Sequence, residues 1–401
     1  MISYKKIILF FALLSLNLGL SCSFYAQDST KQKKIKEPKH FFNTTISLDY
    51  YGKPTIDLNL KGMNPAELAI GQHLKSYGVA QSNLSFYTPL ATINKFNKDS
   101  SVNSNFHLLF TGNYIVLQPQ FAGITDHTLV KYGLGIRAIY NTGKKSIFFF
   151  ETSPFVTQDI SYPSEGIIRL SGTLLWSFSP TNGFNFRLGA TKSFMWGNRF
   201  YLPFIGIRIG RLDKVNFSLQ FPRIASLNIP ISNAVRFSVF TKPQGGVYNF
   251  SNYDTIYKIN NDKANKTIHF GRYEVLTGLR LDVVPNKWLN FYLATGFSTG
   301  NYMAFYSNTY NKGNDLEYWD FFSTSPGNTY FINAGLTLRF GKTKSYYNNR
   351  NIYEAIDLNN TIDPGDNNVN PGNTNIPILK KKKPERVKPS EVQDLIDLND
   401  F

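Results

Sequence analysis

The stretch Asn333-Ala334-Gly335-Leu336-Thr337-Leu338-Arg339-Phe340 decides the fold of this chain. Its residues alternate strictly between apolar and polar side chains. A β-strand has a side-chain period of two, so one face of this segment must meet an apolar medium and the other a polar one. In a soluble sandwich the apolar face would pack on a core. In a membrane barrel it would meet lipid, while the polar face would line the lumen.

The same stretch has the pattern polar-x-Gly-x-x-apolar-x-aromatic. Asn333, Gly335, Leu338 and Phe340 occupy its four defined positions. This pattern resembles the closing-strand signal through which the barrel assembly machinery recognises outer-membrane proteins. We therefore expect residues 44–341 to form a barrel that ends here, and we expect the assembly machinery to be a partner during biogenesis.

The composition agrees with a barrel. The chain has 401 residues, enough for two ordinary domains or one large barrel, with 15% aromatic and 17% charged residues. Its mean hydropathy is nevertheless −0.25, which excludes a helical membrane protein. Abundant aromatics with a polar average are typical of transmembrane strands, because half of each strand faces water.

Residues 1–27 have the pattern of a secretory signal peptide. Lys5 and Lys6 precede an apolar run, and Ala26-Gln27 offers a cleavage point before a polar lead-in over residues 28–43. Lipidation of Cys22 is the alternative, but Gly19 stands where a lipoprotein signal has a leucine-like residue. The formal charge is +16. For an exported protein this predicts contact with outer-membrane lipids and lipopolysaccharide phosphates, and no nucleic-acid partner.

Alternating segments follow one another from residue 44 onward, with short Pro/Asn turns between some and long polar loops between others. We count 12 to 14 strands and favour twelve in an antiparallel up-and-down barrel, since single-chain barrels have even numbers. Asn64-Pro65 starts a helix expected over residues 65–77, either a plug or lid or a simple excursion between strands. A large soluble β-sandwich is the alternative fold.

Charged residues recur on the predicted inward faces. An arginine facing lipid at the bilayer midplane costs about 2–4 kcal/mol, so these side chains should point into the lumen. They could form a basic channel for small anions, or pair with carboxylates and tyrosines in a filled lumen. Small barrels are usually filled, and at twelve strands we favour a filled lumen. The candidates are Arg137, Arg169, Arg187, Arg208, Glu274, Arg280, Asp282 and Arg339.

Catalytic motifs are absent from the sequence. None of the five histidines has metal-binding spacing, and the chain contains no Gly-x-Ser-x-Gly elbow and no phosphate-binding glycine loop. We therefore expect no enzymatic activity, metal or cofactor. His107, on the expected lumen face near Ser101 and Ser104, leaves a lipid-modifying enzyme as an alternative.

Residues 342–401 differ in composition from the rest. This segment is rich in Asn, Pro and Lys and is expected to be a disordered periplasmic tail with a basic cluster at Lys380–Lys383. An Ile-Asp-Leu-Asn repeat is either a docking motif for a periplasmic protein or peptidoglycan, or part of a solvated tail. Its two copies are Ile356, Asp357, Leu358 and Asn359, and Ile396, Asp397, Leu398 and Asn399.

Four features together resemble a family of outer-membrane β-barrels of Bacteroidota with no defined activity. They are the Ala26-Gln27 junction, the run Leu202–Ile207, Phe221-Pro222-Arg223 with Gly245-Gly246-Val247-Tyr248, and the final strand. The resemblance implies a barrel in the cell outer membrane and no active site. A more distant similarity is to barrel subunits associated with type IX secretion, which dock periplasmic partners. We expect a non-enzymatic anchor or scaffold whose tail binds a partner or the cell wall.

Overall fold

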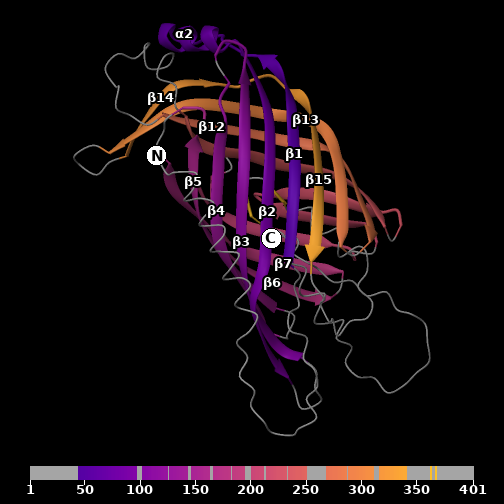
Figure 1. Ribbon diagram of the computed structural model, residues 1–401. Helices are drawn as coiled ribbons and strands as arrows, with labels where there is room; N and C mark the ends of the chain where they lie inside the picture. Colours follow the sequence, from indigo (N-terminus) through magenta and orange to yellow (C-terminus); the bar gives the residue numbers. More distant parts are fainter. Residues whose placement is uncertain are drawn as a thin grey trace. The chain divides into compact units, whose positions relative to one another are not determined.

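The computed structural model describes residues 44–340 and the short segments 362–363 and 366–367. Within the first range it omits 97–101, 125, 143–145, 163–165, 182, 195–199, 212–213, 233, 251–267, 287 and 311–315. The described part of 44–340 is an antiparallel barrel with one helix, α2 (Pro65–Leu74) (Figure 1). Its strands are β1 (Thr44–Asp57), β2 (Ser76–Phe96), β3 (Val102–Phe121), β4 (Leu129–Asn141), β5 (Ser146–Asp159), β6 (Ile167–Thr181), β7 (Phe184–Ser193), β8 (Phe200–Ile209), β9 (Asn216–Phe221), β10 (Ile224–Pro230), β11 (Val235–Phe250), β12 (Ile268–Asn286), β13 (Leu289–Tyr310), β14 (Leu316–Thr324) and β15 (Thr329–Phe340). Two short strands, β16 (Ile362–Asp363) and β17 (Asp366–Asn367), pair only with each other.

The sheet closes between its first and last strands. Consecutive strands pair from β1 to β13, and β15 pairs with both β13 and β1, where Thr44 lies opposite Phe340. Both β14 and β15 run antiparallel to β13, on successive stretches of it, so they are two halves of one strand interrupted at residues 325–328. The ring therefore has 14 strands. The expected up-and-down barrel is confirmed, while the preference for twelve strands was wrong.

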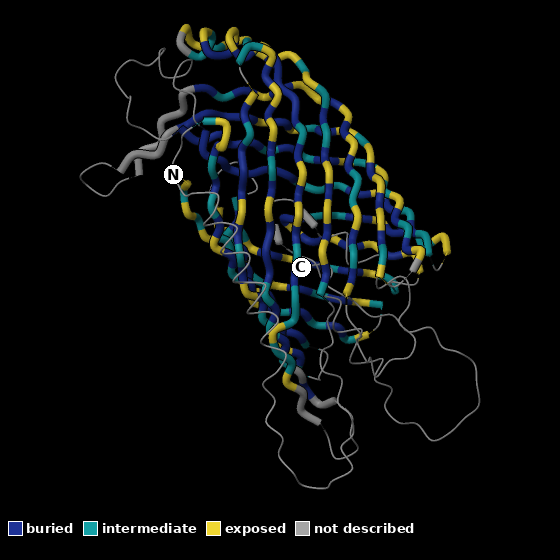
Figure 2. The backbone as a smooth tube through the Cα atoms, in the orientation of Figure 1, coloured by how far each residue is buried: buried dark blue, intermediate teal, exposed yellow. Residues whose placement is uncertain are grey.

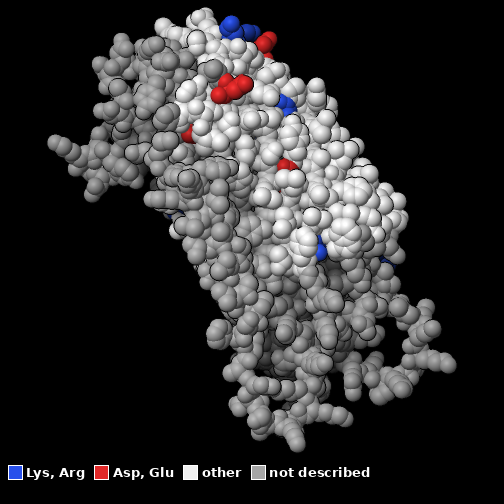
Figure 3. Space-filling view, viewed as in Figure 1, with Lys and Arg blue, Asp and Glu red and all other residues white. Residues whose placement is uncertain are grey.

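Burial in the wall is the reverse of that in a soluble protein. On β1 the polar Thr45 and Asp49 are only 1% and 3% exposed, whereas the apolar Leu48 and Tyr50 are 53% and 50% exposed. Figure 2 shows the same alternation of buried and exposed residues along the neighbouring strands. On the face drawn in Figure 3 the wall carries few charged side chains, most of them near the end with α2. A soluble sandwich is excluded, because an apolar outer face around a polar interior suits a barrel that spans a membrane.

The helix begins where the sequence predicts and ends earlier. Asn64 and Glu67 form a capping box, in which each side chain accepts a hydrogen bond from the other residue's backbone N–H, and Pro65 is the first helical residue. The helix ends at Leu74, because Lys75 adopts a positive φ of 62° and its N–H bonds to the carbonyl oxygen of Gly71. The expected extension to residue 77 belongs to β2 instead. No helix in the described residues is long and apolar enough to cross a membrane.

An apolar core fills the interior at the end that carries α2. Ile70 and Leu74 of the helix are fully buried in this core. The rings of Phe121, Phe270 and Phe305 lie 5.2 to 6.1 Å apart within it. The ends of β11, β12 and β13 that lie on the side of α2 are buried on both faces. β11 contacts β4 and β5 as well as the two strands with which it pairs. The core, the helix and these strand ends pack together at this end of the barrel.

Candidate functional site

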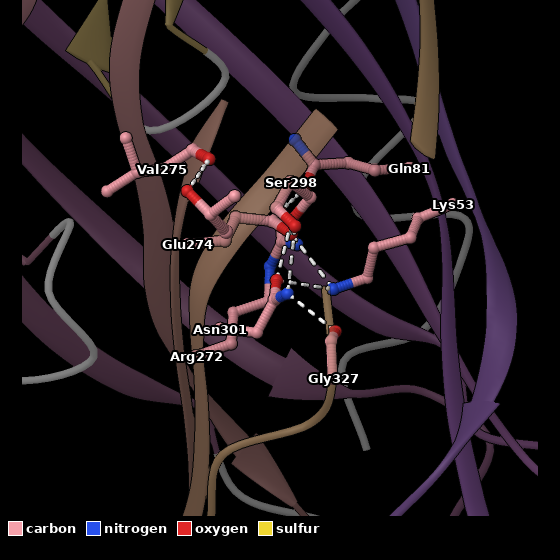
Figure 4. A network of polar contacts seen from close by, with 9 residues as sticks. Lys53, Gln81, Arg272, Glu274, Val275, Ser298, Asn301 and Gly327 are labelled. Atoms are coloured by element: carbon pink, nitrogen blue, oxygen red, sulfur yellow. Dashed lines mark hydrogen bonds and ion pairs between the residues drawn. The ribbon is translucent and has the colours of Figure 1, made fainter. Parts of the chain in front are cut away.

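The most connected group of polar side chains is a buried ion network between β1, β12 and β13 (Figure 4). Lys53 Nζ donates hydrogen bonds to Glu274 at 2.9 Å and to Asn301 at 3.1 Å. The Lys53 and Glu274 side chains are 1% and 2% exposed. Arg272 donates to the other oxygen of the Glu274 carboxylate at 2.8 Å, and to Gln81 at 2.6 Å. One carboxylate therefore serves two cations from different strands.

The network lies where the backbone ladder is interrupted. The β1–β15 ladder ends at the pair Gly52–Ile332, and the backbone pairs described for β14 are all with β13. Beyond Gly52, the link from Lys53 to Glu274 and Asn301 joins β1 to β12 and β13. Asn301 in turn donates to the carbonyl oxygen of Gly327, inside the interruption, at 2.8 Å. Side chains thus bridge the part of the wall that lacks the ladder.

A second cluster lies further down the interior on the same strands. Tyr292 donates a 2.6 Å hydrogen bond to Asp49, and the Arg280 guanidinium lies 3.7 Å from the centre of the Tyr292 ring. Arg280 also forms a hydrogen-bonded ion pair with Asp282 at 2.8 Å. A side chain at Gly335 would overlap both Tyr292 and Asp49. Gly335, the glycine of the closing-strand pattern, therefore has a packing role, since its missing side chain makes room for the Tyr292 ring.

The remaining predicted lumen residues also lie on the inward side of their strands. Arg137 pairs with Glu151 at 3.1 Å. Arg169 on β6 bonds to Thr157 and reaches His269 on β12, on the opposite side of the barrel, at 3.1 Å. The others, all buried, are Arg187, Arg208 and Arg339. In the assembly pattern Asn333 faces inward and accepts a hydrogen bond from Tyr292, whereas Phe340 faces outward and Leu338 shares its side.

Several residues of these clusters were missed by sequence analysis. Asp49 and Lys53 share the inward side of β1, and a strict count of alternate residues from Leu48 and Tyr50 would have found them. Arg272 precedes Glu274 by two positions and so shares its face of β12. Tyr292 gave no sequence signal, because its role depends on Gly335 of a neighbouring strand.

His107 and His127 each lie buried beside a polar side chain. His107 is buried and lies 3.2 Å from the Thr92 hydroxyl, while Ser101 lies outside the described residues. Sequence analysis missed a second pair, His127 and Asp159, which are 2.7 Å apart, fully buried and stacked under Phe250. Within the described part of the chain, no three His, Cys, Asp or Glu side chains are placed to hold a metal ion. Both copies of the Ile-Asp-Leu-Asn repeat fall outside the described residues.

Several of the interior arginines are almost completely shielded from solvent. Arg137, Arg187 and Arg208 are each no more than 2% exposed, although they line a 14-stranded barrel. A hollow of about 10 Å³ beside Ser226, Asn228 and Arg280 has room for about one water molecule.

No family model matches the sequence, and no curated protein matches it either. Solved structures with a similar fold include an outer-membrane channel from Pseudomonas putida F1, with 9% identity, a TM-score of 0.35, and coverage of 77% of this chain and 100% of that one. LpxR from Salmonella typhimurium has 10% identity and a TM-score of 0.31, with coverage of 74% and 100%. The translocator domain of the autotransporter NalP from Neisseria meningitidis has 10% identity and a TM-score of 0.23, with coverage of 84% and 98%. Likenesses this distant carry no argument about the location or the activity of this chain.

Proposed function

We propose that the protein is a closed, non-enzymatic barrel of the bacterial outer membrane that anchors a periplasmic docking segment, residues 342–401. The observation that carries the proposal is the filled interior. Its arginines are buried, Glu274 is paired with two cations, and an apolar core closes the end that carries α2. Such an interior suits a structural role better than a channel for anions.

The orientation follows from the lengths of the connections. On the side of α2 the chain makes long excursions, residues 58–75 between β1 and β2 and residues 251–267 between β11 and β12. On the side of Thr44 and Phe340 the connections include the short turns 142–145, 182–183 and 287–288. Outer-membrane barrels have short periplasmic turns and longer extracellular loops. We therefore assign α2 to the cell surface and the tail to the periplasm.

Single-channel recording in a planar bilayer tests the closed lumen. The full-length protein, folded in detergent and inserted, should give no stable conductance steps. The control is a porin inserted under the same conditions. Anion-selective steps that are weakened by Arg208→Gln or Arg280→Gln would contradict the proposal and support a channel for small anions.

Deletion of residues 342–401 tests the docking role. The truncated barrel should still assemble, as judged by its heat-modifiable gel mobility, because the ladder between β1 and β15 ends at Phe340. It should lose the protein partners that the full chain retains after crosslinking in cells. It should also no longer sediment with purified peptidoglycan. A full-length variant with alanine at Ile356, Leu358, Ile396 and Leu398 separates the repeat from the rest of the tail. Identical crosslinked partners for the full and truncated chains would overturn the anchor role.

The absence of enzymatic activity is tested on the membrane lipids. Mass spectrometry of outer-membrane lipids should show the same species in cells with the protein, without it, and with its His107→Ala variant. A lipid product that depends on His107 would overturn this part of the proposal.

A further inference from the structure

The outward surface of β5 to β8 contains an apolar hollow of about 230 Å³. Its floor is low, because Gly172 on β6 has no side chain and Ala190 on β7 has a small one. The larger outward side chains of Phe150, Leu170 and Leu174 border it. This geometry interrupts the smooth lipid-facing wall with a groove that can receive a hydrocarbon chain.

Polar side chains lie together in one row across this groove. The strand registers place Thr152 opposite Gly172, Gly172 opposite Lys192, and Lys192 opposite Tyr201. The Lys192 ammonium lies 5.7 Å from the centre of the Tyr201 ring. Lys192 has Tyr201 beside it on one side and Thr152 two strands away on the other, across Gly172. A cation in one row with two hydroxyl-bearing side chains is suited to a phosphate group, which accepts hydrogen bonds from both kinds of donor.

Lys192 is unusual for its position on the wall. Among the strand residues whose side chains the structure describes, it is the one lysine or arginine that faces outward. It lies one residue before the end of β7, on the side of α2. A lysine on the lipid face costs about 2–4 kcal/mol at the midplane but only about 0–1 kcal/mol near the interface. Lys192 therefore lies directly beside an apolar groove, near the end of its own strand, and the lower cost favours a position near the interface for its ammonium.

We propose that this groove binds lipid A of the outer leaflet, with one acyl chain over Gly172 and Ala190 and a phosphate at the Lys192 ammonium. The choice of lipid A rests on the proposed orientation, which places this end of β7 at the cell surface. Charge complementarity selects a phosphorylated lipid, and the apolar floor selects its acyl chain over the carbohydrate.

Native mass spectrometry of the full-length protein in detergent tests the site with bisphosphorylated lipid A, its dephosphorylated form, and phosphatidylglycerol. Lys192→Gln should weaken binding of bisphosphorylated lipid A about tenfold, the loss of one charge-assisted contact, and leave the dephosphorylated lipid unaffected. Ala190→Leu should weaken both, because it fills the groove. The matched controls are Lys61→Gln, an exposed lysine in a turn, and Ala334→Leu, which lies on the outward side of β15.

Three outcomes would overturn the proposal. If the Lys192 and Lys61 variants bind bisphosphorylated lipid A equally well, Lys192 does not contact the phosphate. If the Ala190 and Ala334 variants bind it equally well, the groove does not hold an acyl chain. Phosphatidylglycerol bound as tightly as lipid A, with the same dependence on Lys192, would exclude the assignment to lipid A. None of these outcomes changes the conductance or tail experiments, so this proposal and the anchor role fail separately.

Discussion

The two ends of this barrel are built on different physical rules. In the terminal half, around the β1–β15 ladder from Thr44 to Gly52, the interior is polar and the side chains alternate with period two. In the helix half, around α2 and the distal ends of β11 to β13, the interior is apolar and the strand ends are buried on both faces. One chain therefore combines a membrane-type wall with a core resembling that of a soluble protein.

The difference shows how the barrel can be filled. Polar interior groups must find partners, and in the terminal half they do so through pairs such as Tyr292 with Asp49. Apolar groups need only close packing, and the helix half supplies it from distant segments, including α2. The Lys53–Glu274–Arg272 network lies where the ladder between β1 and β15 gives way to side-chain contacts.

The largest effect is expected from a charge placed in the core of the helix half. Phe305 is fully buried against Phe250 and Phe270. Phe305→Asp should lower the free energy of unfolding by more than about 5 kcal/mol, because the lost packing alone costs about 3–5 kcal/mol and an unpaired buried charge adds to it. Urea unfolding in lipid vesicles, followed by tryptophan fluorescence, measures the change. Phe305→Leu is the conservative control. Nearly equal midpoints for the Asp and Leu variants would mean that this half is not a packed core.

A smaller effect is expected from the ion network. Glu274→Gln should lower the free energy of unfolding by about 3–5 kcal/mol, because it leaves the Lys53 and Arg272 cations buried without their shared carboxylate. The same vesicle assay applies. Adding Lys53→Met to Glu274→Gln should recover part of the loss, since one of the uncompensated charges is then removed. A double variant that is destabilised by the sum of two independent losses would show that the pair is not coupled.

Sequence reasoning succeeded where a rule repeats along the chain and failed where distant segments meet. Period two gave the barrel, because each strand displays it locally. The expected count of 12 to 14 strands includes the 14 of the ring, but the choice of twelve within that count was wrong. The apolar core was not predicted at all. Contacts such as Arg169 with His269, 100 residues apart, leave no mark in local periodicity.

The smallest of these effects is expected from Gly335, the glycine of the stretch that decides the fold. A methyl group there would meet the Tyr292 ring and the Asp49 carboxylate, so Gly335→Ala forces both to move. Overpacking of this kind costs about 1–3 kcal/mol, measured in the same vesicle assay. Gly183→Ala is the matched control, because nothing lies within 4 Å of the added methyl group. Adding Tyr292→Phe, which removes the hydroxyl that bonds to Asp49, would not restore stability, whereas Tyr292→Ala should relieve the overlap. If Gly335→Ala is as stable as Gly183→Ala, the glycine of the closing pattern does not serve the packing of the terminal half.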